Sequence, residues 1–591
     1  MSRSKCTETV VRAFAAHPYL TAFALIMLLT PTTFAHIKFV SNAAWISTIM
    51  LIGAAAAGLK YLHEKRGLKK AYTAMIGVPA ASFYVALLAL YQRSEHQTVW
   101  HLFGGSAAVV TLYFLADRKK YKMQLNSLLI TGLGFCLKFY YVLATSIYTR
   151  QNDVGSFDKT DGHTSYMQYL YDNLSLPNFD PRTRWQYCHP PLHHFISAVW
   201  MWINRVLLSP GENPCRESIQ MLSLFYSCCI MITAYRILRH FKLKGAALYI
   251  PLIIINFHPA FVLLSGSINN DVLSITFIMS AVLYTLKWSE SRSMRDIIKL
   301  ALCIGLGMMT KISAALIAPP VAVVFLIVFI RNIKNELIPL LEQFVCFGLI
   351  CVPLGMWFPL YQLLRWGIPL TYVHQMSVYS FQYIGDIPFA ERITDFSLSQ
   401  LTPIYEHWRR ADEYGVYYGD SEHNPLIALL KNSIFGESFG DGTFAEYSFV
   451  YYILPVFFGL NVFIAAAAFL CGVFFTVNKC SATRTAKGFI ACFYLFMMIS
   501  FYKTAADYPF TCTMNYRYIT PTAVIGALYL GFALNALGTP RKRKPPAEGV
   551  IDSTVPRVKL PAKVISIILG AAAACFAVCS VTVYMFLCID S

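Results

Sequence analysis

Charged side chains are scarce in this 591-residue sequence, since only 14% of its residues are Asp, Glu, Lys or Arg and 56% are hydrophobic. A soluble chain of this length divides into several domains, whose surfaces need far more charge. Several apolar runs of 18 or more residues occur instead, and each is long enough to cross a bilayer. The composition therefore excludes an ordinary soluble protein and predicts a polytopic membrane protein.

Metal-type cysteine spacing is also absent. The 16 cysteines include no CxxC pair of the kind found in zinc or redox sites. Many lie within apolar runs, where a thiol behaves as a small hydrophobic group. Cys188, Cys215 and Cys512 are predicted to lie in loops outside the membrane, so a disulfide among them is an open alternative.

Acidic residues are fewer than basic ones, 31 against 49, which gives a net charge of +18. The Lys and Arg residues lie in short clusters between apolar runs, such as 60–70, 117–122 and 541–544, and form no compact basic module. Such clusters set membrane topology and contact anionic headgroups. We therefore expect membrane lipids as partners and no nucleic acid.

Fifteen apolar segments are predicted to span the membrane. They are residues 18–35, 43–60, 72–91, 98–116, 125–147, 217–238, 246–266, 272–288, 297–310, 312–331, 338–362, 449–475, 487–502, 517–537 and 563–587. The basic loops 61–70 and 117–122 place the N-terminus in the cytoplasm. Residues 19–30 also resemble a signal peptide, but a retained first span agrees better with the loop charges. Two long polar loops, 148–216 and 364–448, then face the outer side.

Two segments of the first outer loop are predicted to be helices that lie along the membrane surface. Residues 190–208 are long enough to cross, but crossing would put the basic segment 236–244 outside, against the charge rule. Residues 163–174 carry apolar side chains at helical spacing on one face only. Both segments therefore fit amphipathic helices at the outer interface.

Polar residues that could do chemistry gather in the same loop. Asp153 follows directly after a predicted span, where a carboxylate beside an apolar wall can accept a proton from a hydroxyl. The alternative is an interfacial acid that marks a helix end. His163 and, further on, Arg182, Arg184, His189, His193 and His194 join it in the loop.

Arginine and histidine at headgroup level are suited to phosphate oxygens. Pro190 and Pro191 fix the chain before the second surface helix, so that His189 is presented at its start. Aromatic-like packing is the alternative role for His193 and His194. Their spacing matches no standard metal site, so no cofactor is the favoured interpretation and a divalent metal remains an alternative.

The combination of motifs resembles membrane glycosyltransferases of the GT-C class, and within it the protein O-mannosyltransferase and aminoarabinose-transferase superfamily. The similar segments are "NDVGSF", "GHTSYMQYL", "YCHPPLHHFISAVW", "SGSINNDVLS", "GLGMMTKISAALIAPP" and "CTMNYRYITP". The resemblance covers roughly residues 125–537 and implies an all-α polytopic GT-C fold. Residues 1–124 are then a four-span extension, 538–562 a cytoplasmic basic linker and 563–591 a last span.

The resemblance also implies roles for single residues. In that superfamily the donor is a polyprenyl-phosphate sugar, and a carboxylate at the position of Asp153 acts as general base in an inverting displacement. His189 matches a position that faces the donor phosphate, as Arg182 and Arg184 could. Lys311 and Arg517 are similar to cationic positions near the sugar phosphate, with a snorkelling lysine and a helix-end arginine as alternatives.

Asn270 and Asp271 could bind sugar hydroxyls or cap the following helix. The protein mannosyltransferases carry an acidic pair in the first loop, whereas Val154 follows Asp153 here, so a protein acceptor is not implied. The acceptor could equally be a glycan or a lipid. Neighbouring alternatives are a lipid-linked oligosaccharide ligase or polymerase, and a flippase, although a flippase favours internal repeats that are not seen. A plasma membrane is favoured over the endoplasmic reticulum, with the active site extracytoplasmic or lumenal.

Overall fold

The computed structural model describes residues 15–31, 98–208, 211–538 and 562–589, with short gaps between 371 and 441 and three further residues near the N-terminus. This part of the chain is almost entirely helical. Its only strands are two-residue segments, β1 (Arg410–Ala411) and β2 (Tyr417–Tyr418), which pair antiparallel. The prediction of an all-α polytopic membrane protein is confirmed.

Long apolar helices make up the bundle, and shorter ones lie at its ends. The α-helices of six residues or more are α2 (Pro18–Leu29), α6 (Val99–Leu115), α7 (Arg118–Ala144), α8 (His163–Asn173), α9 (Leu192–Leu208), α10 (Glu212–Glu217), α11 (Ile219–His240), α12 (Ala246–Phe257), α13 (Pro259–Gly266), α14 (Asp271–Ser291), α15 (Met294–Thr310), α16 (Ala318–Trp366), α17 (Phe389–Thr394), α19 (Pro425–Phe435), α20 (Ile453–Val477), α21 (Arg484–Asp507), α22 (Pro521–Gly538) and α23 (Ala562–Ile589).

The predicted number of spans can be compared with the structure only over the described residues. Within the described residues, seven helices are long and apolar enough to cross a membrane, or nine if each of two bent pairs counts as one span. The predicted spans 43–60 and 72–91 lie outside the described residues. Fifteen spans are therefore not confirmed, partly because α6 and α15 are only 17 residues long.

The long helix α16 contains two of the predicted spans. Phe325 and Phe344 stack with ring centroids 5.0 Å apart, whereas 19 residues of straight helix would separate them by about 28 Å. The chain therefore folds back between them, at the non-helical Glu336. The predicted segments 312–331 and 338–362 form an antiparallel pair.

Two predicted spans are bent. Helices α12 and α13 meet at 46°, and the segment Thr511–Ile519 meets α22 at 50°. At the first bend Pro259 has no backbone N–H, and His258 Nδ1 accepts a hydrogen bond from the amide of Ala260 instead. Such breaks leave polar backbone atoms within the bundle, where they form a functional site or contact polar side chains.

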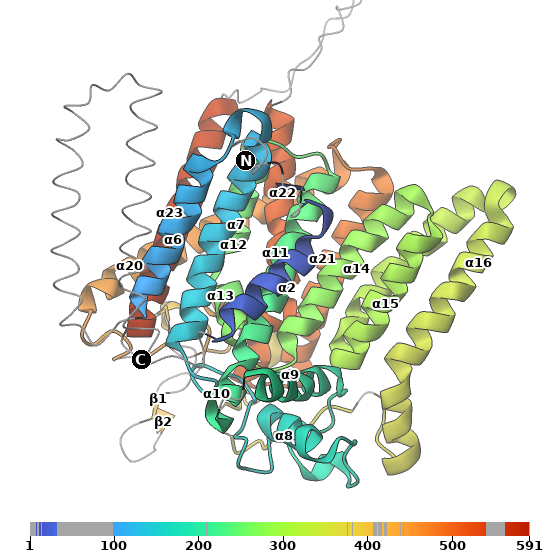
Figure 1. Cartoon of the computed structure of the whole chain (residues 1–591), viewed down its shortest axis with the longest axis vertical. Helices are drawn as coiled ribbons and strands as arrows, with labels where there is room; N and C mark the ends of the chain where they lie inside the picture. Colours follow the sequence, from blue (N-terminus) through green and yellow to red (C-terminus); the bar gives the residue numbers. More distant parts are fainter. Residues whose placement is uncertain are drawn as a thin grey trace, which may run out of the picture.

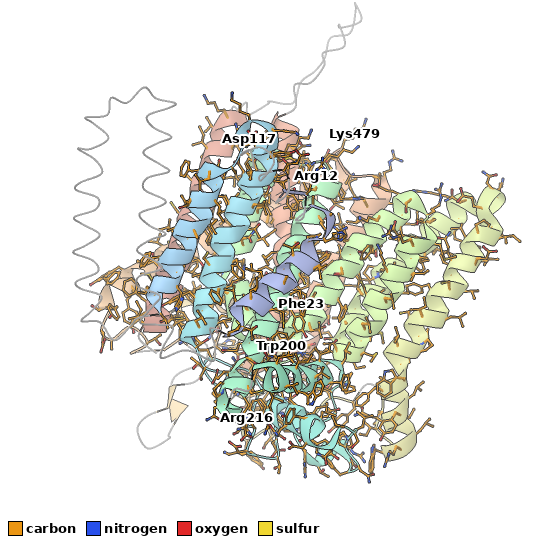
Figure 2. All side chains as sticks on the ribbon, viewed as in Figure 1. Arg12, Phe23, Asp117, Trp200, Arg216 and Lys479 are labelled. Carbon is orange, nitrogen blue, oxygen red and sulfur yellow. The ribbon has the colours of Figure 1, made fainter. Side chains whose placement is uncertain are left out.

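The predicted outer and inner loops gather at opposite ends of the bundle. At one end, Gln362 donates to the carbonyl of Cys188 (3.2 Å). At the other end, Arg292 pairs with Glu336 (2.8 Å). Figure 2 shows Trp200 near the end that carries the first long loop, with Lys479 at the opposite end. Loops predicted to share a side therefore lie at the same end of the bundle, and which end faces the cytoplasm stays a prediction.

The two predicted surface helices are present as α8 and α9. In Figure 1, α9 lies across the end of the bundle, with α8 beyond it and α10 beside it. On α9, His193 and His194 are fully buried, whereas Trp202 is 57% exposed. The helix therefore buries one face against the bundle. Cys188, Cys215 and Cys512 are all free thiols.

Candidate functional site

Four charged side chains from four separate segments meet at this end of the bundle. Arg517 Nη2 donates to Asp153 Oδ2 at 2.6 Å, and its Nε is 3.7 Å from Asp271 Oδ2. Lys311 Nζ donates to Asp271 Oδ1. The cluster thus holds two carboxylates and two cations, and its formal charges cancel. Arg517 and Asp271 are buried, while the Asp153 side chain is 33% exposed and can reach a ligand.

Backbone geometry presents Asp153. Its φ is 62°, in the left-handed region that Asp tolerates at a cost of about 1 kcal/mol. Its carbonyl accepts from the amide of His163 at 3.2 Å, and Thr164 donates to the carbonyl of Val154 at 2.9 Å. These bonds clamp the loop to the start of α8. A Cβ on Gly162 would lie 2.3 Å from the Val154 oxygen, so only glycine fits there.

Asp271 begins α14 and is positioned by two asparagines. Asn269 Oδ1 accepts from the Asp271 amide (3.0 Å), so Asn269 satisfies the helix terminus. Asn270 makes no capping hydrogen bond, and its side chain donates to the carbonyl of Thr310 (3.0 Å). That bond ties the start of α14 to the end of α15 and brings Lys311 beside Asp271.

Arg517 lies on a short 3-10 helix, Tyr516–Ile519, whose preceding residue Asn515 accepts from the Arg517 amide at 2.8 Å. Its Nη2 also donates to the Tyr518 hydroxyl at 2.9 Å. The Tyr518 ring lies 4.9 Å from the Arg517 guanidinium and 5.1 Å from Lys311 Nζ. Both cations therefore lie near the Tyr518 ring, which can stabilise them by cation–π contacts.

The four histidines form a packed group next to the charges. His163 Nδ1 and His194 Nε2 share a hydrogen bond of 2.8 Å, and His193 Nε2 donates to the carbonyl of Ile268 at 2.9 Å. His163 stacks on His189 at 5.4 Å.

Burial keeps these imidazoles neutral at pH 7. Burial, followed by the Lys311 charge, lowers the pKa of His189 to about 4. Burial also lowers the pKa of His193 to about 4, and the pKa values of His163 and His194 fall well below their usual range for the same reason. A neutral His189 can donate a hydrogen bond to phosphate but adds no charge.

The two loop arginines make contacts elsewhere. Arg182 pairs with Asp180 at 2.6 Å and donates to the carbonyl of Trp366 at 3.1 Å. Arg184 lies over the Phe179 ring, 4.1 Å from its centroid. Neither contacts Asp153 or Asp271 in the described part of the chain. Phosphate binding by these arginines stays a prediction.

Sequence reasoning missed several residues. Tyr518, Asn269 and Asn515 build the site by contacts that only the fold creates. Glu437 accepts from Asn515 Nδ2 at 2.7 Å and thereby reaches the segment that carries Arg517. The motif "NYRYITP" contained Tyr518 and Asn515, but nothing in their spacing indicated which atoms they contact.

Two hollows adjoin the cluster and share no lining residue. The first has a volume of about 300 Å³, open solvent included, and lies between α16 and the first outer loop. Its lining residues are Cys188, Ile312, Phe358, Pro359, Gln362, Pro369, Leu370 and Tyr372, of which Cys188 precedes His189 in the chain and Ile312 follows Lys311. The second encloses about 490 Å³, open solvent at its mouth included, and lies between α13, α19 and the loop before α22. Arg517 is part of its wall, as is Asn152, the neighbour of Asp153.

Nothing among the described residues groups three or more His, Cys, Asp or Glu side chains in a way that could hold a metal ion. The histidines bond to each other and to the backbone, and the carboxylates bond to Lys311 and Arg517. The site residues therefore show no fit to a resident metal. Metal dependence of the reaction stays a matter for experiment.

An apolar helical bundle with a charged, partly exposed site where its long loops meet defines a multi-pass membrane enzyme. Residues 189–357 match the family model described as dolichyl-phosphate-mannose-protein mannosyltransferase. The matched segment contains His189, Asp271 and Lys311. The predicted resemblance is confirmed, and the protein is a glycosyltransferase. No curated protein matches the chain.

Proposed function

We propose that the protein transfers a sugar, with mannose as the first candidate, from a polyprenyl-phosphate carrier to an acceptor hydroxyl on the outer or lumenal face. The observation that carries this proposal is the cluster of Asp153, Arg517, Asp271 and Lys311, which combines a reachable carboxylate with two cations. The family description names dolichyl-phosphate-mannose as the donor in similar proteins. The chemistry needs both an acceptor for a proton and a counter-charge for a leaving phosphate.

In the proposed reaction Asp153 takes the proton of the acceptor hydroxyl. The acceptor oxygen forms a bond to the anomeric carbon, and the bond from that carbon to the phosphate oxygen breaks. The polyprenyl phosphate leaves with the bonding electrons, and Lys311 and Arg517 stabilise its charge, with His189 as a neutral donor. Attack from the face opposite the leaving group inverts the anomeric centre.

The ion pairs suggest an order of events. Each cation is bound to a carboxylate in the structure, and the singly charged phosphodiester of an arriving donor competes for both cations. When Arg517 turns toward the phosphate, Asp153 loses its partner and is free to accept a proton. Donor binding would thus activate the base.

The hollow beside Lys311 supports entry of the carrier lipid from the α16 side. Its wall includes the apolar side chains of Ile312, Phe358 and Leu370. A prenyl chain can remain in such a groove while its phosphate reaches Lys311. The acceptor then approaches from the second hollow, whose wall includes Arg517, the ion-pair partner of Asp153.

The test is consumption of dolichyl-phosphate mannose by the purified full-length protein in nanodiscs, compared between wild type and Asp153→Asn. Loss of the base is expected to slow transfer about 10²–10⁴-fold while donor binding persists. Asp158→Asn is the matched control, because Asp158 belongs to the same loop, is exposed and pairs only with Arg216 (3.2 Å).

Transfer by Asp153→Asn at the wild-type rate would refute the base assignment. A panel of other polyprenyl-phosphate sugars identifies the donor, and the anomeric configuration of the product tests inversion. Retention of activity in EDTA is expected, because no metal-binding group is evident among the side chains described above; loss of activity that only one divalent ion restores would overturn that expectation.

A further inference from the structure

Within the described part of the chain, several residues that line the second hollow carry buried donor atoms without a hydrogen-bond partner. The buried atoms without a hydrogen bond are Ser267 Oγ, Asn432 Nδ2, Arg150 Nε, and Nε and Nη1 of Arg517. Ser267, Asn432 and Arg517 are each more than nine-tenths buried. Leaving a buried polar group unpaired is unfavourable, so several such groups around one hollow point to a ligand that pairs with them.

Arg150 gives this hollow its charge. Its guanidinium donates to the Leu587 carbonyl at 3.5 Å and the Cys588 sulfur at 3.8 Å, both near the end of α23, and lies 5.7 Å from the centre of the Tyr141 ring. Across the residues described, no carboxylate lies within ion-pair distance of Arg150. A largely buried cation without a counter-charge is costly, and an anion supplied by a ligand removes that cost.

The backbone supports the same conclusion. Arg150 and Asp153 both hold left-handed φ values, 53° and 62°. The side chain of arginine does not favour this conformation, so holding Arg150 there is unfavourable. The turn therefore puts Arg150, which lines the hollow, three residues before the candidate base.

From these observations we propose that the hollow is the acceptor site and that it selects an acceptor carrying an anionic group, a phosphate or a carboxylate, close to the hydroxyl that is glycosylated. Arg150, Asn432 and Ser267 bind the anion, and the neighbouring hydroxyl reaches Asp153. That the bound molecule is the acceptor rests on the proposed function, but the anion site itself can be tested without any sugar transfer.

The experiment measures binding of three probes to the full-length protein in nanodiscs by calorimetry and by the shift in unfolding temperature. The probes are mannose 6-phosphate, glucuronate and the neutral methyl mannoside. At least one anionic probe is expected to bind tenfold or more tightly than the neutral one. Whichever anion binds better identifies the acceptor class as phosphorylated or acidic.

The sharpest variant is Asn432→Asp, because Asn432 Oδ1 accepts from the Tyr516 amide at 2.9 Å and aspartate keeps that acceptor. The change only replaces the unpaired Nδ2 with a negative oxygen, so it is expected to weaken anion binding at least tenfold without unfolding the protein. Glu437→Gln removes a negative charge from the same wall and is expected to act in the opposite direction. Asn173→Asp on the exposed surface of α8 is the control and should leave binding unchanged.

Equal binding of all three probes would overturn the proposal, as would anion binding that Asn432→Asp leaves intact. Binding of polyprenyl phosphate without a sugar is measured in the same way. If Asn432→Asp weakens the binding of polyprenyl phosphate as much as the binding of the soluble anions, the hollow is a donor phosphate site and the acceptor assignment is wrong. Anion binding without any consumption of donor would instead contradict the proposed function and leave the anion site standing.

Discussion

Arg517 and Asp153 are 364 residues apart in the sequence, and their side chains are joined by a 2.6 Å ion pair. The arginine is buried, whereas one third of the aspartate side chain is exposed. The pair therefore connects the interior of the bundle with the space that a substrate can reach. It also makes the loop before α22 and the first long loop into one site.

Replacing Arg517 tests its part in the reaction. Arg517→Gln is expected to slow sugar transfer about 100-fold, because the charge that meets the leaving phosphate is lost. Arg517→Lys keeps the charge but lacks the guanidinium that faces Asp153 through Nη2 and Asp271 through Nε, so we expect an intermediate rate. Steady-state kinetics with labelled donor measure both. Equal rates for the lysine and glutamine variants would show that geometry, and not charge, is what Arg517 supplies.

The pair between Asp271 and Lys311 is buried, and breaking it should be costly. Asp271→Asn is expected to reduce the free energy of unfolding by about 3 kcal/mol, because Lys311 loses its closest counter-charge. The double variant Asp271→Asn with Lys311→Met should recover much of that stability but no transfer. Thermal unfolding and donor consumption separate the two effects. A single variant as stable as wild type would exclude a structural role for the pair.

Gly162 is expected to be irreplaceable in the loop that holds Asp153. Gly162→Ala places a Cβ 2.3 Å from the Val154 oxygen, so the clamp on α8 must shift and transfer should fall at least tenfold. Gly245→Ala is the matched control: Gly245 also has a left-handed φ, 57°, but no atom lies within 4 Å of its added Cβ. If both variants lost activity equally, the close contact would not be the cause.

The buried histidines predict loss of stability in acid. The pKa of His193 is lowered from 6.5 to about 4, so the unfolded chain binds a proton that the folded protein does not. The contribution of this group is present above pH 6.5 and is lost as the pH falls toward 4, at a cost of roughly 3 kcal/mol. His193→Gln can still donate to the Ile268 carbonyl, and its unfolding temperature should fall less steeply between pH 6.5 and 4. Parallel curves for variant and wild type would contradict this assignment.

Much of the architecture could be predicted from the sequence because it follows from local physics. A run of apolar residues in a bilayer must satisfy its backbone hydrogen bonds within itself, so helices are required. The charges of short loops then assign the two sides, and the amphipathic pattern of residues 163–174 and 190–208 yields α8 and α9. Bends were not predicted, since the break at Pro259 depends on how the bundle accommodates unpaired backbone groups.

For the site, the sequence by itself determined the chemical types: a carboxylate after a span, cations in later loops and histidines before α9. Tertiary structure alone decided their partners. Arg517 lies beside Asp153, while Arg182 turns to Asp180 and Arg184 to Phe179. The physical reason is that an ion pair or an unpaired donor depends on distances of a few ångströms between distant segments, and only the packing of the whole bundle sets those distances.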